Sequence, residues 1–243
     1  MRTSDYHDPI TPDNAAVLFI DHQTQLMLGC QSMEPQELKN NTLALARIAK
    51  IYDLPVVITT TGGGASGPAG PTFSELAAEF PGHEVIDRQT YYNSMQDPTF
   101  RAAVERTGRK KLVIGGITTD LCVVFPAITA VADGYDVYVV GDACASWNRR
   151  IDDLAIARVR QAGAIVTNVQ SLAAELQTNL AARDEAAARR HQTDSFAFYG
   201  TFVGPLGLLN DVFMQSPANR RRFGLDDAGA AGAGGAGAAA AER

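Results

Sequence analysis

Residues 111–122 read KLVIGGITTDLC, an apolar run that ends in two glycines and continues into threonine, aspartate and cysteine. A short run of this kind, rich in Val, Leu and Ile, is typical of a buried strand. Residues 120–133 then carry a helical pattern, and Gly134 follows them, as glycine commonly follows a helix. The stretch therefore predicts a strand that leads directly into a helix.

The same alternation extends outward on both sides of this stretch. Short β-branched runs and longer helical patterns take turns over about the first 180 residues, as in repeated βαβ units. The predicted strands are 15–21, 55–61, 84–88, 111–117, 136–142 and 164–169. The predicted helices are 34–52, one capped by Asp97 that stops near Gly108, 120–133, 152–162, and one that begins at Ser171. This pattern predicts an α/β fold: a doubly wound, six-stranded, mostly parallel sheet in the order 3-2-1-4-5-6, with helices on both faces.

The length of 243 residues suits one sizeable domain followed by a tail. We expect the α/β domain to occupy residues 1–182. Residues 183–227 carry many aromatic and leucine side chains, so they are expected to pack on a neighbouring subunit or on their own domain, which favours a homo-oligomer. Residues 228–243 are nearly all Ala and Gly, and we expect this tail to be disordered because it can bury too little.

The composition argues against several classes of partner. Lys and Arg number 21 against 27 Asp and Glu, which gives a formal net charge of −6, and no basic block could follow a phosphate backbone. Nucleic acid is therefore not expected as a partner. No apolar run approaches the roughly 20 residues that span a bilayer, and the first residues lack the apolar region of a signal peptide. We expect a cytoplasmic protein that does not bind membranes.

Candidate catalytic residues stand at the ends of two predicted strands. The first strand ends in Asp21, and the fourth runs through a turn to Cys122. If the strand order is as predicted, these strands are neighbours about 4.8 Å apart, at the reversal of strand order where ligands bind. A cysteine in the first turn of a helix is expected to favour the thiolate, and the N–H groups there can hold an oxyanion. A carboxylate beside it can take the thiol proton and return it to a leaving amine.

Each of these residues also has a structural interpretation. Cys122 could be a buried side chain on an apolar helix face, and Asp21 could cap a turn. Cys144 follows another strand end and is the rival nucleophile, whereas Cys30 is interpreted as structural. The three cysteines are odd in number and lack CxxC or Cys/His spacing, so neither a disulfide framework nor a zinc site is expected.

Two segments resemble a known family. Residues 17–26, VLFIDHQTQL, and residues 115–130, GGITTDLCVVFPAITA, are similar to the two signature segments of the isochorismatase-like cysteine hydrolases. The spacing to Arg88 and to YYNSMQD is similar too, and the likeness covers roughly residues 12–180, most closely in the YcaC-like branch. The resemblance implies hydrolysis of a carbonyl–nitrogen bond of a small amide, imide or ureide through a thioester on Cys122, without a cofactor. It also implies a triad of Asp21, Cys122 and a basic residue from the third strand.

The resemblance further implies the local geometry of the nucleophile. A cis peptide bond is expected at Ile117–Thr118, with the N–H groups of Thr118 and Cys122 directed at the oxyanion. The third triad residue departs from the family, which commonly has Lys where this chain has Arg88. A guanidinium keeps its proton, so Arg88 could stabilise charge but not shuttle protons. The alternative is a surface arginine paired with Asp87 or Glu84.

Three polar residues near strand ends are candidates for orienting substrate: Gln23, Tyr91 and Asn93. Such residues are also common turn formers. Residues 62–71, GGGASGPAGP, predict a mobile loop after the second strand that could act as a lid over substrate. It contains neither the histidine nor the acidic residue of the nicotinamidase metal motif, so we expect no metal and no nicotinamidase activity.

Two other functional classes remain as alternatives. Arg88 in place of Lys is compatible with a non-catalytic oligomeric scaffold, or a small-molecule-binding protein, on the same fold. A nucleotide-binding Rossmann protein is disfavoured because no GxGxxG follows the first strand.

Overall fold

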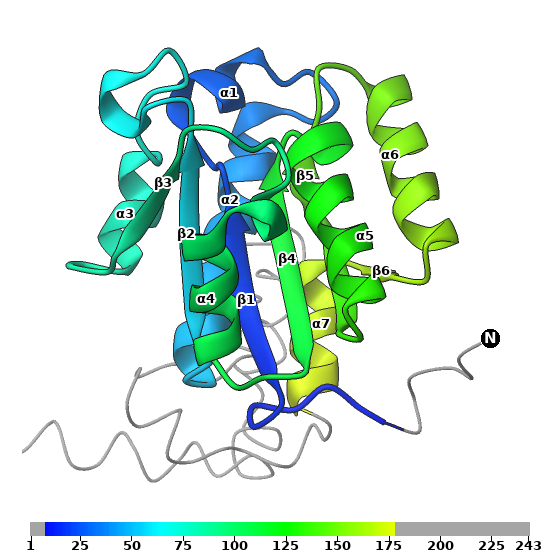
Figure 1. Cartoon of the computed structure of the whole chain (residues 1–243). Coiled ribbons are helices and arrows are strands. Elements are labelled where there is room, and N and C mark those ends of the chain that lie inside the picture. Colours follow the sequence, from blue (N-terminus) through cyan, green and yellow to red (C-terminus); the bar gives the residue numbers. More distant parts are fainter. Residues whose placement is uncertain (1–7, 178–243) are drawn as a thin grey trace, which may run out of the picture. The chain divides into compact units, whose positions relative to one another are not determined.

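The computed structural model describes residues 8–177, and Figure 1 shows their arrangement. Within this part of the chain six strands form one sheet in the order β3-β2-β1-β4-β5-β6, and every neighbouring pair is parallel. The strands are β1 (Ala15–Ile20), β2 (Val56–Thr61), β3 (Val85–Arg88), β4 (Lys111–Ile117), β5 (Asp136–Ala145) and β6 (Ile165–Thr167). The predicted fold class and strand order are confirmed.

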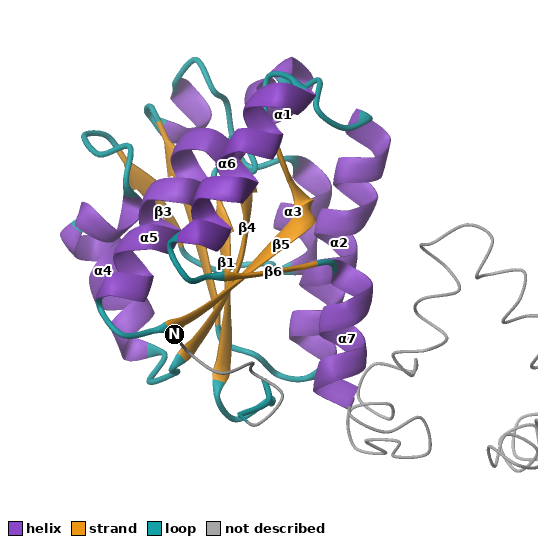
Figure 2. Cartoon of the chain, turned by 90° about the vertical axis from the view of Figure 1, so that its right-hand side faces the viewer, coloured by secondary structure: helices purple, strands orange, loops and turns teal. Residues whose placement is uncertain are grey.

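Helices cover both faces of the sheet, as parallel crossovers require. Figure 2 shows α2, α3 and α7 on one side and α4, α5 and α6 on the other, while α1 lies at the carboxyl ends of the strands in Figure 1. Their bounds are α1 (Thr24–Gly29), α2 (Pro35–Ile51), α3 (Ser74–Glu79), α4 (Pro98–Arg106), α5 (Val124–Ala132), α6 (Arg149–Gln161) and α7 (Val169–Gln177). The sequence pattern missed α1 and α3 because six residues are too few to show a helical period.

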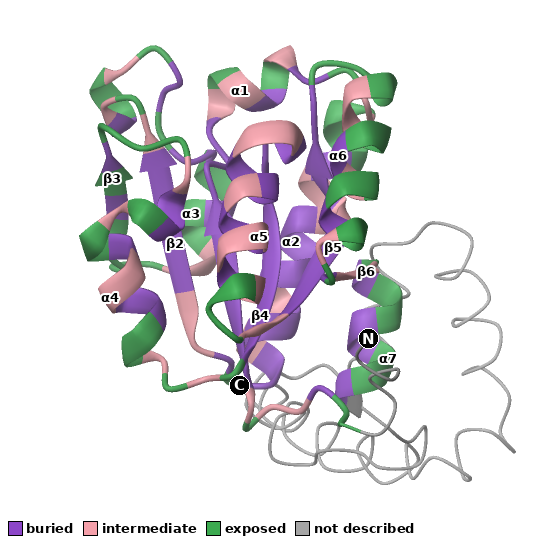
Figure 3. Cartoon of the chain, turned by 45° about the vertical axis from the view of Figure 1, so that its right-hand side comes forward, coloured by how far each residue is buried: buried purple, intermediate pink, exposed green. Residues whose placement is uncertain are grey.

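The core forms between the sheet and its helices, where the buried residues in Figure 3 concentrate. All six residues of β1 are buried, which explains why this strand is a continuous apolar run. On α2 the predicted apolar face is also buried, with Leu38, Leu45, Ile48 and Ala49 each at most 1% exposed. The centre of the sheet therefore provides a rigid base for the residues at the strand ends.

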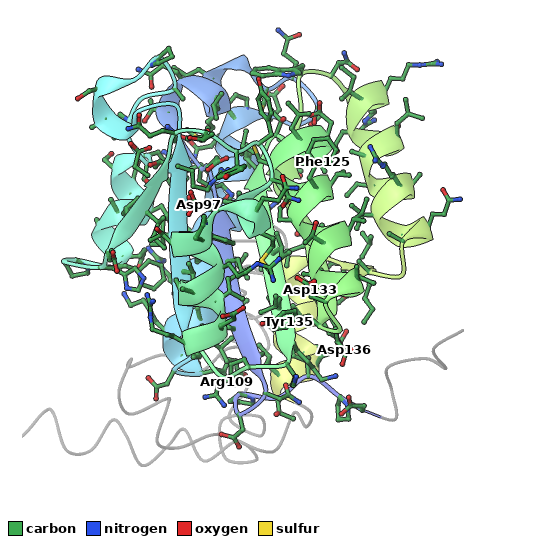
Figure 4. The ribbon with its side chains drawn as sticks, in the orientation of Figure 1. Asp97, Arg109, Phe125, Asp133, Tyr135 and Asp136 are labelled. Atoms are coloured by element: carbon green, nitrogen blue, oxygen red, sulfur yellow. The ribbon has the colours of Figure 1, made fainter. Side chains whose placement is uncertain are left out.

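Side-chain caps set several helix boundaries. Asp97, labelled in Figure 4, accepts hydrogen bonds from the N–H groups of Thr99 and Phe100 at the start of α4, which confirms the predicted cap. Helix α6 begins at residue 149 rather than 152, because the Asn148 side chain accepts from Ile151 N. Helix α7 likewise begins two residues before the predicted Ser171.

Strand β5 is longer than predicted. It continues to Ala145, although Gly141 and Asp142 indicated an end at residue 142. The register shows the reason: Ile114 pairs with Val139, but Gly116 pairs with Cys144, so β5 carries extra residues in a bulge. The bulge keeps the end of β5 beside the strand that leads to Cys122.

In the described residues no helix is long and apolar enough to cross a membrane. The cytoplasmic location stays a prediction. The proposed extension at 183–227 and the tail at 228–243 lie outside the described residues, and the domain boundary at 182 remains a prediction too.

Candidate active site

Asp21 stands directly after the central strand β1, which ends at Ile20. Its backbone is left-handed, with φ of 57°, a conformation that aspartate tolerates better than most residues. Its N–H donates to the carbonyl of Thr59, and its own carbonyl accepts from Gln23 N at 2.7 Å. The chain therefore leaves the sheet sharply at Asp21, whose carboxylate is fully buried at the carboxyl end of the sheet.

Cys122 lies in a tight turn after the adjacent strand β4. The peptide bond Ile117–Thr118 is cis, as the family resemblance implied. Residues Thr119–Val123 then form a π-helical turn, in which the N–H groups of Leu121, Cys122 and Val123 converge on the Thr118 carbonyl at 3.3, 2.9 and 3.3 Å. The Cys122 amide is thus bonded within the turn, whereas the Thr118 N–H faces the sulfur of Cys122, where it acts to lower the pKa of that thiol. The assignment of the Thr118 and Cys122 N–H groups as oxyanion donors stays a prediction.

Two side-chain hydrogen bonds anchor this turn to neighbouring elements. Thr119 Oγ1 donates to Asp152 of α6, and Asp120 accepts from the hydroxyl of Ser146, just beyond β5, at 2.7 Å. The bulged end of β5 and helix α6 therefore both hold the backbone that carries Cys122.

Glycine at the end of β4 permits close packing around the same turn. A Cβ added to Gly116 would lie 2.8 Å from Cγ2 of Val123 and 2.9 Å from the carbonyl oxygen of Ile20. Any side chain there would push β1 and the cysteine turn apart. The pair Gly115–Gly116 in the sequence thus marks the point where the two candidate residues approach each other.

Arg88, at the end of β3, reaches across β2 to the same place. Its Nη2 forms an ion pair with Asp21 Oδ2, and both side chains are fully buried. Its Nε donates to Thr59 Oγ1 at 2.9 Å, and its Nη1 donates to the Tyr91 carbonyl at 2.7 Å. The alternative of a surface arginine paired with Asp87 or Glu84 is therefore wrong.

The electrostatics of the two central groups are coupled. Burial raises the pKa of Asp21 above its ordinary value, although Arg88 opposes that shift. Burial, followed by the negative charge of Asp21, also raises the pKa of Cys122, against a smaller opposing effect of Arg88. Oδ2 of Asp21 is paired with Arg88, and Oδ1 is buried with no nitrogen or oxygen donor in hydrogen-bond geometry. The carboxylate instead lies within hydrogen-bonding reach of the Cys122 thiol. These influences together favour the protonated form of the Cys122 thiol in the folded protein.

This corrects the expectation that the helix N-terminus would favour the thiolate of Cys122. The N–H groups of the turn are directed at the Thr118 carbonyl, so they do little to offset the loss of solvation at the sulfur. The adjacent carboxylate adds to the same effect. A thiol with a raised pKa needs a base to activate it, which is the part that Asp21 is placed to play.

The rival cysteine offers a less suitable site. Cys144 is fully buried, and burial raises the pKa of its thiol. Burial, with Asp152 and Asp120 nearby, raises the pKa of Cys30 to about 12. Neither has a carboxylate paired with a buried arginine as Cys122 does.

The three candidates for orienting substrate have different surroundings. The buried amide of Gln23 donates to the carbonyls of Thr61 and Gly70 and accepts from Thr61 N, so it clamps the glycine-rich loop. Asn93 caps a 3₁₀ turn and donates to Thr129 of α5 at 2.9 Å.

The side-chain amides of Gln23 and Asn93 are thus both hydrogen-bonded to other parts of the protein. The predicted mobile loop at 62–71 contains a 3₁₀ turn at Gly64–Ser66, and the Gln23 clamp ties it to the end of β1. Tyr91, which is 40% exposed, is the most exposed of the three candidates, whereas Asn93 is half-buried and Gln23 is fully buried.

Two residues at the site were not singled out from the sequence. His22 is buried between aromatic rings, with Nε2 at 3.1 Å from the Ala143 carbonyl, and burial lowers its pKa to about 4. It is therefore a neutral packing residue. Thr59 contacts Arg88, and its signal in the sequence is the run of three threonines, 59–61, that ends a buried strand.

Within residues 8–177 no group of three or more His, Cys, Asp or Glu side chains is arranged to hold a metal ion.

Comparisons with known proteins show the family and the fold of this chain. The isochorismatase domain model matches residues 15–171. The chain is 41% identical over 164 residues to the Escherichia coli protein described as "Probable hydrolase YcaC". This match covers 68% of this chain and 78% of the relative. A Staphylococcus aureus nicotinamidase at 20% identity, with a TM-score of 0.54, shares the fold.

Two solved structures are similar over most of the chain. The Pseudomonas aeruginosa YcaC, solved with hexane-2,5-diol and covalent acrylamide, has a TM-score of 0.77 and 36% identity, and the match covers 86% of this chain and 99% of that one. The Escherichia coli YcaC, described as an octameric hydrolase of unknown specificity, has a TM-score of 0.78 and 34% identity, with 87% and 98% covered. The chain therefore belongs to the isochorismatase-like hydrolase superfamily, in its YcaC-like branch.

Proposed function

We propose that this protein is a cysteine hydrolase that cleaves the carbonyl–nitrogen bond of a small amide, imide or ureide. The observation that carries the proposal is the buried Asp21–Arg88 ion pair beside Cys122. A buried charge pair is costly to build, and here its carboxylate also lies within hydrogen-bonding reach of the Cys122 thiol. Such an arrangement supports proton transfer more than it supports stability.

In the proposed reaction Asp21 Oδ1 takes the proton of the Cys122 thiol as the sulfur attacks the substrate carbonyl. The tetrahedral oxyanion that forms is held by the N–H of Thr118. When the carbon–nitrogen bond breaks, the leaving nitrogen takes the proton from Asp21, and a thioester remains on Cys122. Water, deprotonated by Asp21, then attacks the thioester, and the sulfur leaves and regains its proton. Arg88 keeps its charge throughout and holds Asp21 in place.

The Pseudomonas aeruginosa relative gives a chemical guide to the ligand. Acrylamide, bound covalently in that structure, is both a small amide and an electrophile that thiols attack. We propose that Cys122 reacts with acrylamide in this protein, and that small neutral amides fit the same site.

A direct test compares Cys122→Ala with the wild type on a panel of small amides, imides and ureides, by released ammonia or amine. Turnover of any accepted substrate should fall at least about 1,000-fold, because the nucleophile is lost. Mass spectrometry should also find one acrylamide adduct on the wild type and none at this position in the variant. The matched control, Cys144→Ala, should keep both properties. If Cys122→Ala still turned over the substrate, the proposal would be wrong.

The same experiment addresses the alternative of a binding protein without turnover. A protein of that kind would hydrolyse nothing on the panel, and its Cys122 would react with acrylamide no faster than an ordinary buried thiol. Fast adduct formation at Cys122 together with released amine separates the enzyme from it.

We also propose that the protein forms a homo-oligomer, as the octameric Escherichia coli relative does. Large apolar side chains are exposed in the described residues, including Tyr92 at 73%, Leu28 at 68% and Leu154 at 63%, and burial in an interface would remove them from water. Sedimentation velocity at micromolar concentration should give a mass well above that of one 25.9 kDa chain. A monomer under these conditions would refute the oligomer.

A further inference from the structure

The ion pair joins residues from strands that are not neighbours. Asp21 follows β1 and Arg88 ends β3, and β2 lies between them in the sheet. Two strand spacings amount to about 10 Å, so the arginine side chain must pass over β2 to reach the carboxylate. The register places Thr59 of β2 opposite Ile20, the residue before Asp21, and places Thr61 opposite Arg88. Thr59 is therefore the residue of β2 over which the guanidinium passes.

Thr59 contacts both members of the pair. Its backbone carbonyl accepts from the N–H of Asp21 at 2.9 Å, and its hydroxyl accepts from Nε of Arg88 at 2.9 Å. The threonine side chain is fully buried, so water does not compete for these bonds. One residue thus fixes the backbone of the carboxylate and the side chain of the arginine relative to each other.

The hydroxyl of Thr59 is also held in direction. It donates its single proton to the Ile86 carbonyl at 2.6 Å, with a longer contact of 3.3 Å to the Thr60 carbonyl. Both acceptors belong to the sheet, so the proton points into the sheet and a lone pair remains for Arg88. The Tyr91 carbonyl supports the other side of the guanidinium through Nη1 at 2.7 Å.

We propose that Thr59 is a positioning residue for the proposed reaction, and that it aims the guanidinium of Arg88 at the carboxylate of Asp21. The expected effect on turnover rests on the proposed function, whereas the contacts of Thr59 with Arg88 and Asp21 do not depend on it. Without the hydroxyl, the Nε–H of Arg88 loses its acceptor in a buried place, and the guanidinium can turn away from Asp21 toward the Tyr91 carbonyl. Arg88 would then counteract the negative charge of Asp21 less effectively, and the thiol of Cys122 would become harder to ionise.

The test compares Thr59→Val, which keeps the shape and removes the hydroxyl, with Thr59→Ser, which keeps the hydroxyl. A matched control is Thr60→Val on the next residue of β2, whose Oγ1 bonds to Asp87 at 3.2 Å. The first measurement is the pH dependence of acrylamide addition to Cys122 in the full chain, located by peptide mass spectrometry. The second is kcat and KM for an accepted amide, and the third is Tm.

Thr59→Val should move the pH midpoint of Cys122 alkylation upward and lower kcat about tenfold, with a smaller change in KM. Thr59→Ser should restore both values. Thr60→Val is expected to change Tm without moving the alkylation midpoint, as a merely structural role would.

The inference is overturned if Thr59→Val lowers Tm but leaves the alkylation midpoint and kcat at their wild-type values. It is equally overturned if Thr60→Val shifts the midpoint as much as Thr59→Val does. Failure of the proposed function has a different signature, namely turnover that survives Cys122→Ala whatever residue stands at position 59.

Discussion

Replacing Arg88 by Met is expected to lower the free energy of unfolding by about 3–5 kcal/mol at pH 8. The substitution keeps much of the side-chain length but leaves the carboxylate of Asp21 buried without its positive partner. It also removes the donors to Thr59 and to the Tyr91 carbonyl. Urea unfolding of both proteins measures the loss.

The loss should shrink as the pH falls. Burial already raises the pKa of Asp21 above its unfolded value of 3.8, and Arg88 is the main opposing influence. Without Arg88 the folded pKa rises further, so the folded variant takes up a proton at a pH where the unfolded chain has released it. Proton uptake by the folded state adds stability at acid pH that disappears as the pH rises through the folded pKa. The difference between variant and wild type should therefore be smaller at pH 5 than at pH 8.

A control for this experiment is Arg101→Met. Arg101 pairs with Asp133 at 2.8 Å, with side chains 36% and 33% exposed, and solvated pairs of this kind contribute about 1 kcal/mol or less. A loss for Arg88→Met no larger than that of the control, or one that is equal at pH 5 and pH 8, would contradict a buried, charge-compensating role for Arg88.

Replacing Asp21 by Asn should reduce turnover about 100- to 10,000-fold, the usual contribution of a general acid–base group. The same substitution should lower the pH at which Cys122 is alkylated. The negative charge of Asp21 raises the pKa of that thiol, while Arg88 lowers it, so removal of the carboxylate leaves only the favourable charge. The variant would thus have a more easily ionised thiol and yet a slower reaction.

These opposite effects separate proton transfer from simple electrostatic support. Alkylation by iodoacetamide across pH, followed at the Cys122 peptide, gives one quantity, and amine release from an accepted substrate gives the other. Asp87→Asn is the matched control, because the charge of Asp87 affects the pKa of Asp21 less than Arg88 does and its side chain is exposed. If alkylation in Asp21→Asn moved to higher pH instead, the electrostatic coupling of the two groups would be disproved.

Much of the fold could be predicted from the sequence because the signals for strands and helix starts are local. Buried parallel strands such as 15–20 and 111–117 appear as apolar runs, and Asp97 marks a helix start by itself. Where a local signal was misleading, a contact distant in sequence decided the result. Gly141 and Asp142 indicated the end of β5, but pairing with β4 through Gly116 and Cys144 carried the strand further.

The same division applies to the site. The strand-end position of Asp21 and the turn at Cys122 were predictable, since the order of the strands brings their carboxyl ends together. The sequence left the contacts of Arg88 undecided, because the path of a long side chain depends on the residues that it crosses. In the folded chain the Arg88 side chain passes over β2, where Thr59 accepts a hydrogen bond from its Nε. The backbone partner of the Gln23 amide and the threonine partner of the Asn93 amide could be seen only in the folded chain, and the role of these residues toward substrate stays a prediction.

The sequence by itself determined the parallel sheet, the order of its strands and the two strand ends that carry Asp21 and Cys122. It could do so because apolar periodicity and glycine positions are local features that can be identified without the tertiary structure. Only the tertiary structure decided the direction in which the pKa of the Cys122 thiol is shifted and the pairing of Arg88 with Asp21. Burial and the distances between charges depend on atoms that are far apart in sequence, and both burial and the negative charge of Asp21 raise the pKa of the Cys122 thiol.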